Sequence, residues 1–187
     1  MQNLTQKPLS RRVVLALALA ASLAAPAYAA LKAGAKAPDF TAPATLGGKE
    51  FQFTLSEALK KGPVVLYFYP AAFTSGCTVE AHLFAEATEK FAALGATVIG
   101  VSKDDIATLN KFSVSECRSK FAVAADPDLK IAQSYEAKLP LLNYADRTSF
   151  VITPDGEVNY AYSALSPDKH VANTLAAIKA WNEKQGK

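Results

Sequence analysis

Cys77 is the residue of this chain whose type and surroundings best suit chemistry. It follows the segment 74–76, Thr-Ser-Gly, which in turn follows an apolar run, residues 64–69, that Pro70 ends. Threonine and serine commonly cap helices, and apolar residues recur at helical spacing from Val79 to Leu94. We therefore expect Cys77 in the first turn of a helix, where unpaired N–H groups and the helix dipole stabilise a thiolate.

The helix terminus alone does not supply enough stabilisation for a reactive cysteine. It contributes at most about 2 kcal/mol, whereas full ionisation at neutral pH requires roughly 3 kcal/mol. A second donor or a cation must therefore lie close to Cys77. A lone cysteine is more often a small buried apolar residue, but a loop that directly follows a core strand is a place where catalytic groups are common.

Pro70, Thr74 and Cys77 form the pattern Pro-x-x-x-Thr-x-x-Cys, which resembles the active-site signature of the peroxiredoxins. The segment 66–80 is most similar to the peroxiredoxin Q, or bacterioferritin comigratory protein, branch of that family. This resemblance implies that Cys77 attacks a peroxide and that Pro70 shields the thiolate. It also implies that Thr74 and backbone N–H groups, including that of Gly76, bind the peroxide oxygens.

The same resemblance assigns two charged residues to the site. Arg147 occupies the position of the arginine that faces the attacking sulfur in peroxiredoxins, and its permanent charge and several donors suit that role. Without the resemblance, Arg147 would be interpreted as an exposed residue paired with Asp146. Glu80, one turn after Cys77, is expected to support the arginine, or else to be a solvated residue near the helix terminus.

Cys117 is the second of two cysteines in the chain. An even number of cysteines in an exported protein permits a structural disulfide, and an inert core thiol is another interpretation. The resemblance implies a third one, in which Cys117 forms an intramolecular disulfide with oxidised Cys77. In many peroxiredoxin Q proteins the resolving cysteine lies five residues after the first, where this chain has His82. Counting helical turns from Ile106 places Cys117 on the buried face of the next helix.

Residues 1–29 have the composition of a secretory signal peptide. They contain three basic residues and no acidic one, an apolar run too short for an ordinary membrane span, and a small-residue cleavage site, with cleavage expected before Ala30. Ser10 and the pair Arg11 and Arg12 also resemble a twin-arginine signal. We therefore expect export by the Sec or the twin-arginine route, most simply to a bacterial periplasm.

Cleavage of that segment changes the charge balance. Three of the 20 basic residues are lost, and the remaining 17 match the 17 acidic residues, although the full chain has a net charge of +3. Nothing then favours nucleic acid or a membrane surface as a partner. No metal site is expected, because the only two histidines, His82 and His170, lie apart from any cysteine or acidic cluster.

The order of the expected elements indicates one α/β domain over residues 30–187. A hairpin over 37–53 precedes the strand that leads to Cys77, and a second buried strand, 97–101, follows the Cys77 helix to complete a βαβ unit. A helix opened by Asp104 and Asp105, a hairpin over 149–162 and a closing helix from Pro167 complete the chain. We interpret this order as a thioredoxin-like fold with a mixed central sheet and an N-terminal hairpin extension.

We therefore expect an exported thiol peroxidase without a cofactor. It would reduce hydrogen peroxide or organic hydroperoxides and would itself be reduced by a thioredoxin-like or other dithiol protein. By resemblance we expect a monomer. One alternative is a one-cysteine mechanism in which Cys117 takes no part. The other is an exported redox sensor or docking module that uses Cys77 without efficient turnover.

Overall fold

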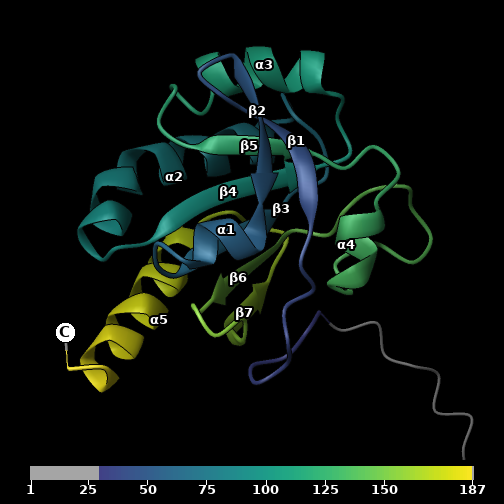
Figure 1. The fold of residues 1–187 in the computed structure, drawn as a ribbon. Helices are drawn as coiled ribbons and strands as arrows, with labels where there is room; N and C mark the ends of the chain where they lie inside the picture. The colour runs from purple at the N-terminus through teal and green to yellow at the C-terminus, as the bar shows by residue number, and fades with distance from the viewer. Residues whose placement is uncertain (1–29, 187) are drawn as a thin grey trace, which may run out of the picture.

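The computed structural model describes residues 30–186, which form a seven-stranded sheet with helices on both faces (Figure 1). The strand order is β2-β1-β5-β4-β3-β6-β7. The strands are β1 (Thr41–Leu46), β2 (Lys49–Thr54), β3 (Val64–Phe68), β4 (Thr97–Ser102), β5 (Ala122–Ala125), β6 (Thr148–Ile152) and β7 (Val158–Ser163). The helices are α1 (Leu55–Leu59), α2 (Ser75–Ala93), α3 (Ile106–Ser115), α4 (Lys130–Ser134) and α5 (His170–Lys184). The expected signal peptide lies outside the described residues.

The strand that leads to Cys77 is the centre of the sheet. All five residues of β3 are buried, as the unbroken apolar run predicts for a strand covered on both faces. β3 pairs in parallel with β4 and antiparallel with β6. The expected βαβ unit is therefore formed by β3, α2 and β4, and the carboxyl ends of β3 and β4 lie at the same edge of the sheet.

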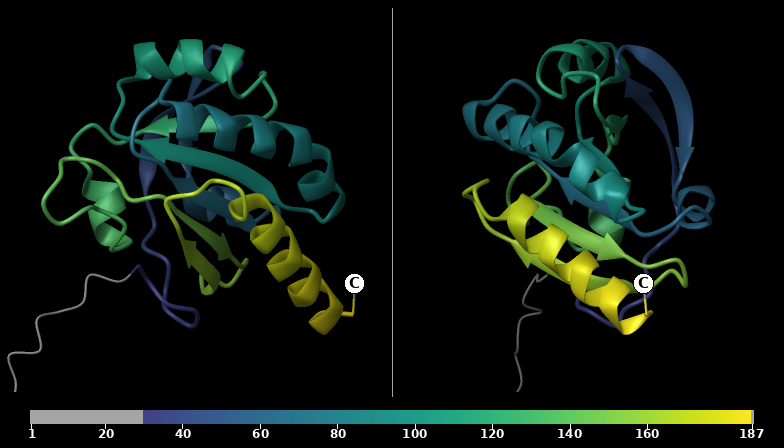
Figure 2. Two further views of the ribbon diagram at one scale, coloured as in Figure 1. Left: turned by 180° about the vertical axis from the view of Figure 1, so that it is seen from behind. Right: turned by 90° about the vertical axis from the view of Figure 1, so that its left-hand side faces the viewer.

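Two apolar cores fill the space between the sheet and its helices. One lies between the sheet and α1 and α4, and the other between the sheet and α2, α3 and α5. Figure 2 shows α2 and α5 side by side over the second face. Both cysteines belong to this second core, so the α2 face of the sheet is the face that carries the sulfur chemistry.

Several elements differ from those expected from the sequence. The strand β5 and the short helix α4 were not predicted, because four small apolar residues and a five-residue helix carry little periodicity. The expected N-terminal hairpin is present at one edge, where β1 also pairs with β5. Within residues 30–186 no helix combines the length and the apolar character that spanning a membrane requires.

The position of Cys117 is a correction to the sequence-based interpretation. Helix α3 ends at Ser115, so Cys117 lies in the turn that follows and not within the helix. Its N–H still donates to the carbonyl of Phe112 at 3.0 Å, and the next residue, Arg118, has a left-handed backbone with φ of 51°. The predicted burial is nevertheless confirmed, because the Cys117 side chain is 0% exposed.

Candidate active site

Cys77 is the third residue of α2 and is only 2% exposed. The first hydrogen bond of the helix runs from the Thr78 N–H to the Thr74 carbonyl at 2.9 Å, so the N–H groups before it are free to face an anion. Thr74 is the N-cap residue, with the expected extended backbone. The structure therefore places Cys77 where the sequence predicts it, at the positive end of a 19-residue helix.

The loop between β3 and α2 is fixed by a carboxylate that the sequence analysis did not assign to the site. The Asp104 Oδ2 atom accepts a hydrogen bond from the Ala72 N–H and another from the Ser102 hydroxyl, both at 2.7 Å. Phe73 in this loop has a left-handed backbone, with φ of 63°. A non-glycine residue in this conformation requires support from its surroundings, which Asp104 supplies.

Three residues of the loop motif were assigned roles around Cys77. The Thr74 hydroxyl donates to the Ala71 carbonyl at 3.0 Å, and no side-chain cap bond forms from it to the helix. Pro70 follows β3 as predicted and is half-buried. Gly76 has a contact that the sequence did not suggest, because a Cβ atom placed on it would lie 3.0 Å from the Arg147 Nη2 atom. Gly76 therefore allows Arg147 to approach the helix terminus.

Arg147 supplies the second donor that the thiolate requires. Its Nη2 atom donates to the Cys77 Sγ atom at 3.4 Å, and its Nε atom donates to the Leu165 carbonyl at 2.9 Å. Its Nη1 atom forms an ion pair with the Glu80 Oε2 atom. The side chain is almost completely buried. Burial alone would lower the pKa of Arg147, but the negative charges of Glu80 and Cys77 raise it, so the guanidinium stays charged.

Glu80 is a buried partner of Arg147 and not a solvated residue, because its side chain is 0% exposed. Burial raises the pKa of Glu80 from 4.5 to about 7, and the Arg147 charge opposes that rise. Its Oε2 atom contacts Arg147, whereas its Oε1 atom has no hydrogen-bond partner. The predicted site residues Cys77, Arg147 and Glu80 therefore meet in one buried cluster.

His170 and Ser149, which were not predicted as site residues, lie next to this cluster. The His170 Nδ1 atom lies 3.6 Å from the Glu80 Oε1 atom and 2.8 Å from the Ser149 Oγ atom. Both side chains are fully buried. No local motif marks either residue, since they come from α5 and β6 and meet Glu80 only through the fold. Among the described residues no group of three or more histidine, cysteine or acidic side chains could bind a metal ion.

Cys117 is a free thiol in the same core as Cys77. Burial, together with the charge of Glu116, raises the pKa of Cys117 far above its ordinary value, so this thiol is neutral in the folded protein. Three polar contacts join the segment 116–120 to α2, of which two are ion pairs and the one to His82 is a hydrogen bond. They connect Glu116 to His82 at 2.9 Å, Arg118 to Glu86 at 3.2 Å and Lys120 to Glu89 at 3.7 Å.

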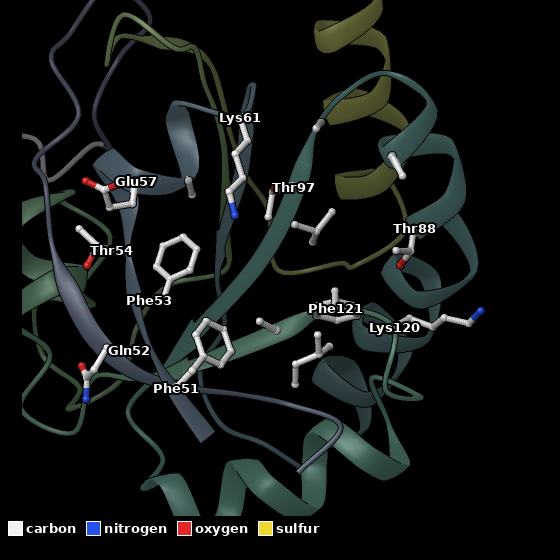
Figure 3. Close-up of a pocket in the computed structure, with 16 residues that line it drawn as sticks. Phe51, Gln52, Phe53, Thr54, Glu57, Lys61, Thr88, Thr97, Lys120 and Phe121 are labelled. Atoms are coloured by element: carbon white, nitrogen blue, oxygen red, sulfur yellow. The ribbon is translucent and has the colours of Figure 1, made fainter. Parts of the chain in front are cut away.

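A groove of about 420 Å³ lies away from these cysteines, between the β1–β2 hairpin, α1 and the second half of α2 (Figure 3). Its apolar wall includes Phe51, Phe53 and Phe121, and Lys61 extends along its rim (Figure 3). Neither Cys77 nor Arg147 lines this groove. The chemistry suggested by the sequence therefore belongs to the buried cluster at the start of α2.

Comparisons with known proteins identify the family of this chain. Residues 33–161 match the AhpC/TSA family. The protein belongs to this family, the peroxiredoxins. This peroxiredoxin is 35% identical over 154 residues to a peroxiredoxin of Mycobacterium tuberculosis, a match that covers 80% of this chain and 97% of that relative. The family predicted from Pro70, Thr74 and Cys77 is therefore confirmed.

Further relatives agree with the predicted branch and fold. This peroxiredoxin is 33% identical to chloroplast peroxiredoxin Q of rice, Oryza sativa, over 79% of this chain and 66% of the rice protein, just under two thirds of its length. The crystal structure of peroxidoxin BcpB from Mycobacterium tuberculosis is similar, with a TM-score of 0.74 and 34% identity over 80% of this chain and 97% of that one. The thioredoxin-like α/β fold is confirmed.

Proposed function

We propose that this peroxiredoxin is a thiol-dependent peroxidase whose attacking group is the Cys77 thiolate. The sulfur attacks one oxygen of the peroxide, an S–O bond forms and the O–O bond breaks. Cys77 becomes a sulfenic acid, and the leaving oxygen takes a proton to give water or an alcohol. The observation that carries this proposal is the 3.4 Å contact of Arg147 Nη2 with Cys77 Sγ at the start of α2.

The surroundings of Cys77 suit the charge that develops in this step. Negative charge passes from the sulfur to the leaving oxygen, and a fixed cation together with the free N–H groups of a helix terminus stabilises both positions. We assign the binding of peroxide oxygens to Arg147, to Thr74 and to the N–H groups at Gly76 and Cys77. Pro70, which ends the preceding strand, limits the access of water to the sulfur.

We further propose that Cys117 resolves the sulfenic acid. The Cys117 thiol attacks the oxidised sulfur, an S–S bond forms and the S–O bond breaks with release of water, and an external thioredoxin-like or other dithiol protein reduces the disulfide. Burial and a raised pKa make Cys117 unreactive in the folded state. The segment 116–120 must therefore open before the disulfide forms, which requires its hydrogen bond and its two ion pairs with α2 to break.

The cellular setting is part of the same proposal. A cleaved signal peptide at residues 1–29 would direct the enzyme to an exported location such as the bacterial periplasm. We propose that the exported enzyme acts as a monomer. Cleavage before Ala30 is checked by the mass of the protein recovered from the periplasmic fraction of an expressing bacterium. Retention of residues 1–29 there would contradict the assignment.

The decisive experiment is the second-order rate constant for oxidation of Cys77 by hydrogen peroxide, with Cys77→Ser as the control. A rate constant no higher than that of a free thiolate would refute the peroxidase proposal and favour the sensor alternative. Intact mass after one equivalent of peroxide tests the second step. Loss of two hydrogens and a Cys77–Cys117 peptide are expected, whereas unchanged multiple-turnover activity of Cys117→Ser would establish the one-cysteine alternative.

A further inference from the structure

The guanidinium of Arg147 is fixed at two positions, and the groups that fix it come from different elements. Its Nη1 atom pairs with Glu80 on α2, and its Nε atom donates to the Leu165 carbonyl in the loop after β7. Only the Nη2 atom faces the Cys77 sulfur. The direction in which Arg147 faces that sulfur therefore depends on the relative placement of Glu80 and the 164–165 loop.

His170 contacts both of these supports. Its Nδ1 atom lies 3.6 Å from the Glu80 Oε1 atom, and its Nε2 atom lies 3.1 Å from the Ala164 carbonyl oxygen. The contacts form a closed circuit that runs from Arg147 through Glu80, His170 and the 164–165 backbone to Arg147, in which the step from Glu80 to His170 is packing and not a hydrogen bond. A second link strengthens the circuit, because the Ala164 N–H donates to the Arg147 carbonyl at 3.2 Å.

The surroundings of His170 also define which of its nitrogens carries the proton. A carbonyl oxygen only accepts hydrogen bonds, so Nε2 must donate to Ala164. The Nδ1 atom then accepts from the Ser149 hydroxyl at 2.8 Å. Burial lowers the pKa of His170, and the Arg147 charge acts in the same direction, so the imidazole of His170 is neutral. The Tyr162 ring packs edge-on against it, with 4.8 Å between the ring centroids.

We propose that His170 is a positioning residue for the Cys77 chemistry, because it holds the 164–165 backbone by a hydrogen bond and packs against the Glu80 carboxylate, and so limits the movement of both supports of Arg147. The assignment rests on the proposed role of Cys77 as the attacking thiolate. An arginine side chain has many rotamers, and a pair with one carboxylate leaves the guanidinium free to pivot. The neutral imidazole of His170 restricts this pivoting without adding a charge to the site. It is fully buried against Glu80, Ser149, Tyr162 and Ala164.

Three substitutions of His170 separate its two nitrogens. His170→Gln retains a donor near the Nε2 position, His170→Asn retains an acceptor near the Nδ1 position, and His170→Phe removes both. The readout is the pH profile of Cys77 alkylation by iodoacetamide in a Cys117→Ser background, together with the rate of oxidation by peroxide. We expect His170→Phe to move the alkylation midpoint upward by about one pH unit and to slow peroxide oxidation roughly ten- to a hundredfold, with the two amide variants in between.

A double variant tests whether the effect passes through Arg147. In an Arg147→Lys background, His170→Phe is expected to shift the alkylation profile little further, because the group that it positions has already been replaced. The proposal is overturned if His170→Phe lowers the melting temperature but leaves the alkylation profile unchanged, or if its shift is equally large in both backgrounds. If His170→Phe does not fold, His170→Gln and His170→Asn are compared with wild type in the same two backgrounds.

The alkylation measurement also separates this proposal from the proposed function. Iodoacetamide reports the ionisation of Cys77 without any peroxide. A wild-type protein that reacts slowly with peroxide would refute the peroxidase proposal, and the alkylation shift would still show whether His170 acts on Cys77 through Arg147. A normal wild-type rate with an unshifted His170→Phe profile would refute only the role of His170.

Discussion

The Arg147 Nη2 atom lies 3.4 Å from the Cys77 Sγ atom, although the two residues are 70 positions apart in the chain. The two residues come from different elements, since Arg147 directly precedes β6 and Cys77 lies in the first turn of α2. β3 pairs with β6, and this pairing brings the two ends together at one edge of the sheet. The reactivity of the sulfur therefore depends on the pairing of β3 with β6 as well as on the local sequence motif.

Arg147→Lys is expected to reduce the reactivity of Cys77. Lysine keeps a positive charge but loses the fork of donors that reaches Glu80, Leu165 and the sulfur together. We expect the pH midpoint of Cys77 alkylation to rise by about one unit and peroxide oxidation at pH 7 to slow by roughly a hundredfold. Arg118→Lys, at an exposed ion pair, is the matched control and is expected to leave both values unchanged.

Glu80→Gln is expected to change how stability depends on pH. The pKa of Glu80 is raised from 4.5 to about 7 in the folded protein, so the folded state binds this proton more tightly than the unfolded state does. The free energy of unfolding of the wild-type protein therefore falls by roughly 3 kcal/mol relative to that of Glu80→Gln as the pH rises from below 4.5 to above 7.

The measurement for Glu80 is urea unfolding of both proteins at pH 4, 5, 6, 7 and 8. The difference in unfolding free energy between the two proteins removes the contributions of titratable groups that both proteins contain. His170 is one such group, since its lowered pKa makes stability fall as the pH drops below about 6.5. A difference in unfolding free energy that does not vary with pH would contradict the assignment of a raised pKa to Glu80.

Gly76→Ala is expected to make the protein less active without making it more stable. Alanine near the start of a helix lowers the entropy of the unfolded chain, a gain of up to about 1 kcal/mol that the crowded contact with Arg147 offsets. The new Cβ atom would lie 3.0 Å from the Arg147 Nη2 atom, and the guanidinium has little room to shift because Glu80 and Leu165 fix it. We expect peroxide oxidation to slow about tenfold. Ser75→Ala, one residue earlier and exposed, is the control, and equal rates for the two variants would contradict the prediction.

The attacking residue and its local surroundings could be predicted from the sequence because they are encoded in one continuous segment. Pro70, Thr74 and Cys77 lie within eight positions, and the change from apolar run to helical spacing marks the boundary between β3 and α2. The role of Arg147 was predicted from a family resemblance alone, since an arginine after an aspartate is ordinarily a surface residue. The structure confirms its contact with Cys77.

The parts that sequence reasoning missed depend on contacts between distant segments. His170 and Ser149 carry no motif, and Asp104 was interpreted only as a residue that opens a helix. Each becomes part of the site because the fold brings it against α2 or the loop before it. The end of α3 was also missed, since no glycine or proline marks it, and the left-handed turn uses Arg118 instead.

The ion pair between Arg118 and Glu86 is expected to slow the opening of the segment that carries Cys117. Arg118→Glu replaces an attraction to α2 with a repulsion, so the segment opens more often and Cys117 becomes more accessible. Exposed pairs of this kind are weak, and we therefore expect alkylation of Cys117 in a Cys77→Ser background to speed up by only about two- to fivefold.

A charge reversal makes this prediction specific to the pair. Glu86→Arg combined with Arg118→Glu restores opposite charges, so the alkylation rate of Cys117 should return toward the wild-type value. Lys130→Glu, which breaks the exposed pair between Lys130 and Asp128, is the control and should leave the rate unchanged. The difference between Arg118→Glu and wild type should also shrink in 1 M salt, where exposed charges are screened within about 3 Å. If the double reversal reacts as fast as Arg118→Glu alone, the opening of the segment does not depend on this ion pair.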